Sequence, residues 1–321
     1  MADNMPAADE MTMGILLQPY IALLLSGMLA MVFVLSLYIW KNDKDRDHRE
    51  TIQKRFISMG ICCMLAPLPV IGFIHYYDQQ PKYLVWLGLS PVGLPNALIW
   101  PLMLTGTLFL GPLVDENILS RRPGTIGTSR ITSTTMKEFC CCFFHPLDDF
   151  TLKVWRNYVV APLAEELVFR ACICSLLVHG GWSHTVAGIV APLMFGFAHL
   201  HHLVEHMRHA NHGFAKALTM AGFQMCYTTV FGIYASFLFF RTGHLLAPFI
   251  SHAFCNKMGL PDFQSLFTSK YRKALTIVYI TGIIGFISLL MPLTTPEWYN
   301  PYIWYYQAPP PPPGGAGGAQ T

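Results

Sequence analysis

Long apolar runs, separated by short charged or Pro/Gly-rich stretches, dominate the chain from residue 14 to residue 290. Each run is rich in Leu, Ile, Phe and Met and continuous, whereas a barrel strand would be short and alternate in polarity. One helical crossing of a bilayer takes about 20 such residues. We therefore predict an all-α, polytopic membrane protein with about eight transmembrane helices, over residues 14–40, 57–76, 83–114, 158–180, 184–200, 217–240, 244–256 and 274–290.

The run over residues 83–114 is too long for one straight crossing and contains Pro91, Pro95 and Pro101. Prolines kink or interrupt helices, so the run is either one tilted, kinked helix or a broken pair. We interpret it as a single crossing. That choice returns the chain to the side of the membrane from which the second run departed.

Basic residues set the orientation of the helices. The loop after the first run carries six of them: Lys41, Lys44, Arg46, Arg49, Lys54 and Arg55. The polar segment 115–157 carries Arg121, Arg122, Arg130, Lys137, Lys153 and Arg156. Because cytosolic loops of membrane proteins are enriched in Lys and Arg, both segments are predicted to face the cytosol, and the N-terminus the opposite side.

Composition agrees with the apolar pattern. Hydrophobic residues make up 53% of the 321 residues and charged residues 12%, about half the charged fraction of a soluble domain, which is about 25%. A net charge of +3 without a basic stripe excludes nucleic acid as a predicted partner; the lipid bilayer is the predicted surrounding. We expect one integral-membrane domain over residues 1–306 and a disordered Pro/Gly-rich tail over 307–321.

Ionisable side chains inside the apolar runs are the candidates for chemistry, because each costs about 2.5–3.5 kcal/mol or more on insertion. The fourth run contains Glu165, Glu166 and Arg170 in the stretch EELVFR. Arg170 follows Glu166 by four residues, so the two can pair on one helical face. This pairing would leave Glu165 available for another role.

Two further polar pairs lie in later runs. Phe195 and His199 are four residues apart in the fifth run, as are His252 and Asn256 in the seventh. Since the fourth and fifth runs are antiparallel, Glu165 and His199 lie at similar depth near the cytosolic side. A carboxylate and an imidazole in a pocket can activate a water, and a His with an Asn can stabilise an oxyanion. The set predicts a hydrolase.

Other interpretations of these residues stay open. The glutamates and arginine can form a structural ion-pair network, and each histidine can be a hydrogen-bonded interhelical residue of a non-catalytic scaffold or transporter. Glu165, His199 and His252 can also be read as ligands of a metal-dependent protease, although no HExxH pair is present. The His-rich segment after His199 and the run Cys140, Cys141 and Cys142 remain without an assigned role, surface palmitoylation and interfacial packing both being compatible with the cysteines.

The motifs EELVFR, FGFAH and HAFCN together resemble those of the CAAX protease and bacteriocin-processing superfamily of intramembrane glutamate proteases. They span residues 161–256, about the central third of the chain. The resemblance implies removal of the last three residues from proteins whose C-terminal CAAX cysteine is farnesylated or geranylgeranylated, Ras-type small GTPases among them. It also implies a multi-pass protein of the endoplasmic reticulum membrane, with its active site toward the cytosol.

The same resemblance assigns roles to individual residues. Glu165 and His199 would activate the attacking water, with Glu166, Arg170 and Phe195 in support. His252 and Asn256 would form the oxyanion hole. Neither a metal nor another cofactor is required in that scheme.

Overall fold

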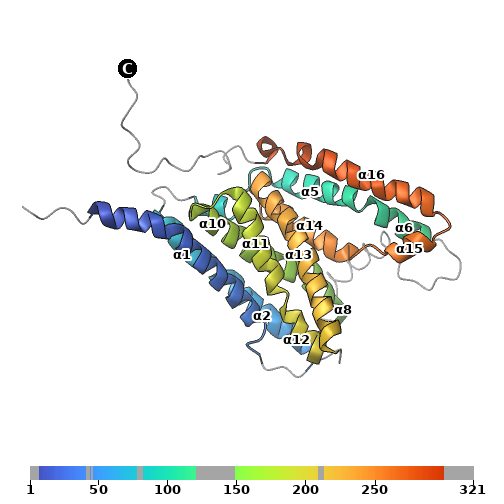
Figure 1. Cartoon of the computed structure of the whole chain (residues 1–321), viewed down its shortest axis with the longest axis horizontal. Coiled ribbons are helices and arrows are strands. Elements are labelled where there is room, and N and C mark those ends of the chain that lie inside the picture. Colours follow the sequence, from blue (N-terminus) through green and yellow to red (C-terminus); the bar gives the residue numbers. More distant parts are fainter. Residues whose placement is uncertain are drawn as a thin grey trace, which may run out of the picture.

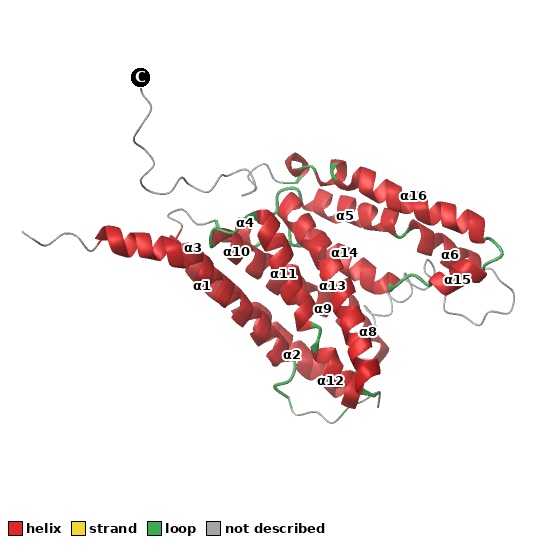
Figure 2. Cartoon of the chain, in the orientation of Figure 1, coloured by secondary structure: helices red, strands yellow, loops and turns green. Residues whose placement is uncertain are grey.

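The computed structural model describes residues 7–40, 44, 46–77, 82–120, 149–208 and 213–299. Within these ranges the chain folds into helices joined by short loops, with no strand (Figure 2). The all-α, polytopic fold class is therefore confirmed. Cys140, Cys141, Cys142 and the tail 307–321 lie outside the described residues.

Five helical segments of the described chain are long and apolar enough to cross a membrane. They lie in α1 (Ala7–Ser36), α2 with α3 (Arg49–Leu65 and Pro67–Tyr77), α11 (His184–Ala198) with its continuation to Leu203, α13 (Phe214–Thr242) and α16 (Arg272–Leu290). Each coincides with a predicted run. The predicted total of eight is not confirmed, because the remaining runs form broken, polar or short helices.

The Pro-rich run over residues 83–114 is broken near its start. It forms α4 (Tyr83–Trp86), α5 (Leu94–Leu108) and α6 (Leu110–Ser120). Gly88 and Gly93 between α4 and α5 have φ values of 69° and 77°, a left-handed conformation that favours glycine. A Cβ atom on Gly93 would also collide with the main chain of Tyr299. The continuous part of this run therefore begins at Leu94.

The helix that carries the glutamates is longer than predicted and is not a regular α-helix. It runs without interruption through α8 (Asp149–Trp155), η1 (Arg156–Val160), α9 (Ala161–Glu166), η2 (Leu167–Cys174) and α10 (Ser175–His179). The segments η1 and η2 are π-helical. In η1 the Ala161 N–H donates to the carbonyl of Arg156, five residues back. Such wider turns are frequent at functional sites.

Neighbouring helices surround this central helix. η2 lies against α1, α11 and α13, and α9 lies against α14 (Leu246–Met258), which also packs on α5 and α13 (Figure 1). Every residue from Val168 to Leu177 is buried. The glutamates are therefore held on a rigid, enclosed element, which is a good platform for a site.

Close packing of α11 on α13 depends on Gly196. A Cβ atom there would collide with the Thr229 hydroxyl and lie 3.0 Å from the Met225 carbonyl oxygen. The approach places the last turn of α11, which precedes His199, directly against α13. After α11 the chain forms α12 (His201–Arg208), and the C-terminal part adds α15 (Phe263–Thr268), η3 (Pro292–Thr294) and η4 (Pro296–Trp298).

Candidate active site

Glu166 and Arg170 form a fully buried ion pair at the centre of the helix bundle. The Arg170 Nη1 atom lies 3.1 Å from both Oε1 and Oε2 of Glu166, and both side chains are 0% exposed. The predicted i, i+4 pairing is therefore confirmed. Burying two charges is costly, and their attraction offsets that cost only when the geometry is good.

Aromatic rings enclose the Arg170 guanidinium. Its Cζ atom lies 4.5 Å from the centroid of Phe195 and 5.9 Å from that of Phe231, within the range of cation–π attraction. The absence of a side chain at Gly232 leaves room for Nη2, which would be 3.1 Å from a Cβ atom there. Sequence reasoning missed Phe231 and Gly232, because an aromatic residue and a glycine in an apolar helix carry no distinguishing signal.

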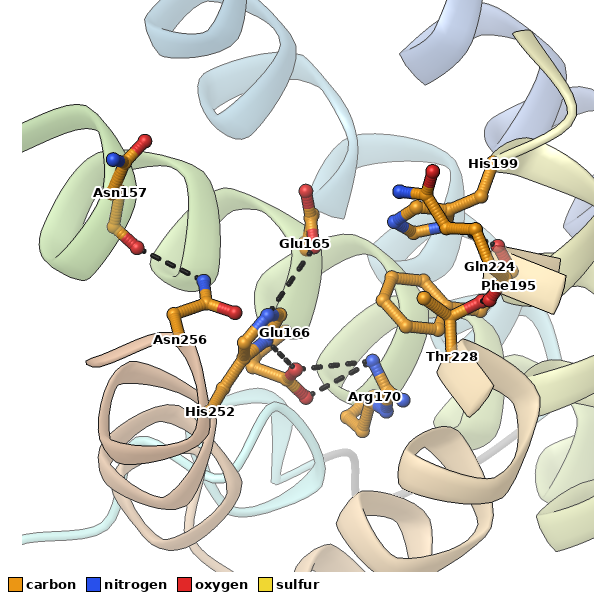
Figure 3. Close-up of polar contacts among 10 residues, drawn as sticks. All are labelled: Asn157, Glu165, Glu166, Arg170, Phe195, His199, Gln224, Thr228, His252 and Asn256. Carbon is orange, nitrogen blue, oxygen red and sulfur yellow. Dashed lines mark hydrogen bonds and ion pairs between the residues drawn. The ribbon is translucent and has the colours of Figure 1, made fainter. Parts of the chain in front are cut away.

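His252 lies between the two glutamates (Figure 3). Its Nδ1 atom is 2.7 Å from Glu166 Oε1, and its Nε2 atom is 3.7 Å from Glu165 Oε2. Arg170 contacts Glu166 and not Glu165 in this arrangement. Glu166 thus has two partners, whereas among the described residues Glu165 has an ion-pair contact with His252 only. The Glu165 side chain keeps 18% of its surface exposed, so solvent reaches it.

His199 has a different environment from His252. Its Nδ1 atom lies 2.8 Å from the main-chain carbonyl oxygen of Phe195. A carbonyl oxygen only accepts hydrogen bonds, so Nδ1 carries the proton and donates it. In the neutral ring Nε2 is then the acceptor. Figure 3 shows Glu165 between His252 and His199.

The Phe195 ring connects the parts of the site. Its centroid lies 4.6 Å from that of His199 and 6.3 Å from that of His252, and the ring also covers Arg170. The expectation that Phe195 and His199 share a helical face is confirmed. One apolar ring thereby sets the spacing between two imidazoles and a guanidinium that come from three different helices.

Asn256 lies one turn after His252 on α14 and is exposed. Its Nδ2 atom donates to the main-chain carbonyl of Asn157, at 2.9 Å. An amide nitrogen has two N–H groups, so one is used by Asn157 and the other is available to a ligand. Sequence reasoning missed Asn157, because a main-chain carbonyl has no motif of its own.

The metal alternative requires a different arrangement of these side chains. Among the side chains that the structure describes, no three His, Cys, Asp or Glu residues are grouped so as to hold a metal ion. Both ring nitrogens of His252 already face carboxylates. Ligation by Glu165, His199 and His252 together would have to replace at least one of these contacts.

Comparisons with known proteins point to one family. The model of the family "Type II CAAX prenyl endopeptidase Rce1-like" matches residues 148–258, which include all seven predicted site residues. Human CAAX prenyl protease 2 is 38% identical over 275 residues, covering 85% of this chain and 80% of its own. The Arabidopsis thaliana protein of the same name is 33% identical over 85% of this chain and 89% of its own.

A more distant relative extends the match to fungi. The probable CAAX prenyl protease 2 of Schizosaccharomyces pombe is 31% identical and covers 84% of this chain and 91% of its own. No solved structure gives a significant match. The matches to the curated relatives extend well beyond the motifs, over most of each protein. The chain therefore belongs to the CAAX prenyl protease 2 family.

Proposed function

We propose that the protein is an intramembrane endopeptidase that removes the C-terminal tripeptide from proteins whose CAAX cysteine carries a farnesyl or geranylgeranyl group. Its relatives are named for proteolysis of prenylated CAAX proteins. Substrates of this class include Ras-type small GTPases. The proposed location is the endoplasmic reticulum membrane, with the site toward the cytosol, in agreement with the basic loops.

The observation that carries the proposal is the partly exposed Glu165 side chain of α9, with His252 Nε2 of α14 at 3.7 Å and His199, just after α11, on its other side (Figure 3). Glu165 takes a proton from water, with the Nε2 atom of His199 as a second acceptor, and the oxygen attacks the scissile carbonyl carbon. The C–O bond forms, the C–N bond breaks, and the abstracted proton passes to the leaving amine.

In this scheme His252 donates through Nε2, which at 3.7 Å makes no hydrogen bond with Glu165, and Asn256 through its second N–H, to the oxygen that becomes negative during this attack. Donors that are fixed before the reaction stabilise such an oxyanion without reorganisation. Glu166 holds His252 through Nδ1, and Arg170 balances the charge of Glu166. Glu166, Arg170 and Phe195 are therefore positioning residues in this scheme.

Trimming of a farnesylated CAAX peptide by the purified chain in detergent tests the proposal. We expect release of the tripeptide from the farnesylated peptide and a much slower reaction with its unprenylated counterpart. Glu165→Ala should lower kcat by about 10³-fold or more, while Glu50→Ala, in an exposed ion pair with Lys44, should leave it unchanged. A folded wild-type protein without activity would favour the scaffold or transporter alternative.

A strong chelator separates this mechanism from the metal-dependent one. Activity that persists after chelation but disappears in Glu165→Ala supports a water activated by side chains alone. Activity that is lost on chelation and restored by added Zn²⁺ would instead support ligation by Glu165, His199 and His252.

A further inference from the structure

The main-chain carbonyl of Asn157 accepts a hydrogen bond from a side chain of another helix, Asn256 of α14. In a regular helix it would accept from the N–H of residue 161, and in a π-helical turn from that of residue 162. The Ala161 N–H donates to Arg156 instead, and residue 162 is proline, which has no N–H. Both helical donors are thus diverted or missing, and Asn256 Nδ2 donates to this carbonyl at 2.9 Å.

This contact fixes the orientation of the Asn256 carboxamide. Only the nitrogen end can donate to a carbonyl, so the Asn157 oxygen determines which end of the amide faces it. The second N–H of Nδ2 then has a defined direction. Without the anchor, an exposed Asn side chain at the end of α14 would populate several rotamers and both amide orientations.

A second set of contacts holds the turn that presents this carbonyl. Arg156 Nε donates to Asn157 Oδ1 at 2.9 Å, and Arg156 Nη1 donates to Asp47 Oδ1 at 2.8 Å and to the Arg46 carbonyl at 3.0 Å. The Arg156 side chain is only 11% exposed. Asp47 lies in the loop between α1 and α2, so the cytosolic loop and the turn are joined by charge-assisted hydrogen bonds, which are stronger than neutral ones.

We infer that Pro162 and the Asp47–Arg156 pair are positioning elements for Asn256: they hold the Asn157 carbonyl where it orients the Asn256 carboxamide toward the developing oxyanion. The inference rests on the proposed function for the role of Asn256. Pro162 acts because it has no N–H to compete for the Asn157 carbonyl. Asp47 acts indirectly, by holding Arg156, which in turn holds Asn157. Neither touches the substrate.

Pro162→Ala is the decisive variant, because it restores an N–H that competes with Asn256 for the Asn157 carbonyl. Alanine also favours helix formation more than proline does, so the variant should fold. We expect kcat to fall about tenfold with KM unchanged, part of the 10²–10³-fold typical of losing one oxyanion donor. Asp47→Asn, at the exposed end of the relay, should lower kcat about threefold, since the neutral amide still accepts a weaker hydrogen bond.

Matched controls separate positioning from general effects on the fold. Pro101→Ala replaces another proline inside a helix, in α5, and Glu50→Gln removes the carboxylate of another ion pair in the same polar region. Neither should change kcat. Each variant is then combined with Asn256→Ala in a double-mutant cycle. In that background Pro162→Ala and Asp47→Asn should change kcat by less than about twofold, because residues that act through one group are not additive.

Additive losses in the cycle would overturn the inference, since Pro162 and Asp47 would then act independently of Asn256. A wild-type protein that fails to trim the peptide would contradict the proposed function instead. In either case, amide hydrogen exchange tests whether Pro162 and Asp47 stabilise the hydrogen bond between Asn256 and the Asn157 carbonyl. Residues 253–258 should exchange faster in Pro162→Ala and Asp47→Asn but not in Pro101→Ala or Glu50→Gln, and equal exchange in all four variants would refute the anchor.

Discussion

The two histidines of the candidate site differ in what surrounds them. His252 has a carboxylate at each ring nitrogen, with Glu166 at 2.7 Å and Glu165 at 3.7 Å. His199 donates from Nδ1 to a neutral main-chain carbonyl and packs on Phe195. The Nδ1 atom of His252 therefore faces a carboxylate, whereas Nδ1 of His199 faces a neutral carbonyl and leaves Nε2 as the acceptor of the neutral ring.

In the proposed function the two histidines take part in different steps. The role proposed for His252 is to donate a hydrogen bond to the developing oxyanion. A ring with an acceptor nitrogen can take part in proton transfer. The proposed function thus has a donor side, formed by His252 and Asn256 of α14, and a proton-accepting side that Glu165 of α9 shares with His199.

Substitution of the histidines gives the largest effects and tests this separation directly. His199→Ala should lower kcat by about 10³–10⁴-fold, the upper part of the range for general base catalysis. His252→Ala should lower it by about 10²–10³-fold, as for an oxyanion donor. The assay is trimming of the farnesylated peptide under saturating conditions.

Glutamine at the same positions sharpens the comparison, because its amide donates hydrogen bonds but does not accept a proton at neutral pH. His252→Gln should recover part of the activity that His252→Ala loses. His199→Gln should recover none. Equal recovery at both positions would contradict the division into a donor side and a proton-accepting side.

The next largest effect is expected from Glu166→Gln, measured as thermal stability in detergent. The change leaves the buried Arg170 charge without its partner, which typically costs about 3–5 kcal/mol. Replacing both residues, in Glu166→Gln/Arg170→Met, should cost less than the single change, since no charge then stays buried. Glu50→Gln, in an exposed pair, should leave the melting temperature unchanged. A double variant less stable than the single one would show that the pair matters by packing and not by charge.

Gly196→Ala tests the proton-accepting side by disturbing the packing of α11 on α13 next to His199. The added methyl group meets the Thr229 hydroxyl and the Met225 carbonyl oxygen, at 3.0 Å from the latter, and overpacking of this kind costs about 1–3 kcal/mol. Because Gly196 precedes His199 by less than one turn, activity should fall together with stability. Gly222→Ala in α13, where a Cβ atom meets nothing within 4 Å, is the control and should be neutral or stabilising. Adding Thr229→Ala to Gly196→Ala should restore part of the lost stability. A Gly196→Ala variant as stable as the wild type would contradict the close approach of α11 and α13.

The smallest effect concerns Asp47, outside the membrane-spanning helices. Partial burial raises the pKa of its carboxyl, but the hydrogen bond and charge of Arg156, with the charges of Arg46 and Lys153, outweigh this and hold the pKa below its ordinary value. A lowered folded-state pKa contributes stability above the ordinary value of about 3.9 that is lost as pH falls through the folded value. The melting temperature of the wild type should therefore exceed that of Asp47→Asn by a constant amount from pH 5 to 8. The difference should shrink below about pH 4, and a difference that disappears near pH 6 would implicate another group.

The sequence specified the parts of this structure that depend on local spacing. Apolar runs predicted α1, α11, α13 and α16, because lipid requires continuous apolar helices. The four-residue interval from Glu166 to Arg170 predicted their ion pair, since side chains at that spacing share a helical face. The four-residue interval from Phe195 to His199 likewise predicted their contact.

Features that depend on tertiary packing were not accessible in the same way. The position of His252 between both glutamates joins residues 86 apart in the chain, and no local pattern encodes the rotation of α14 that produces it. The break after α4 was uncertain because prolines allow either a kink or an interruption; close approach of Gly93 to Tyr299 determines the outcome. Pro162 was visible in the sequence, but the consequence of its missing N–H for the Asn157 carbonyl follows only from the π-helical turn.

The two π-helical segments, η1 and η2, make the direction of each site side chain depend on the number of residues in this helix. Each residue advances an α-helix by about 100°, from 3.6 residues per turn. A π-helical turn contains more residues, so the side chains after it point in other directions than they would in a regular helix. Deleting a single residue within Arg156–Val160 would favour a regular α-helix and turn Asn157 away relative to Glu165 and Glu166. Homologous chains that share this site should therefore differ freely in loop length but conserve the residue count between Asn157 and Arg170.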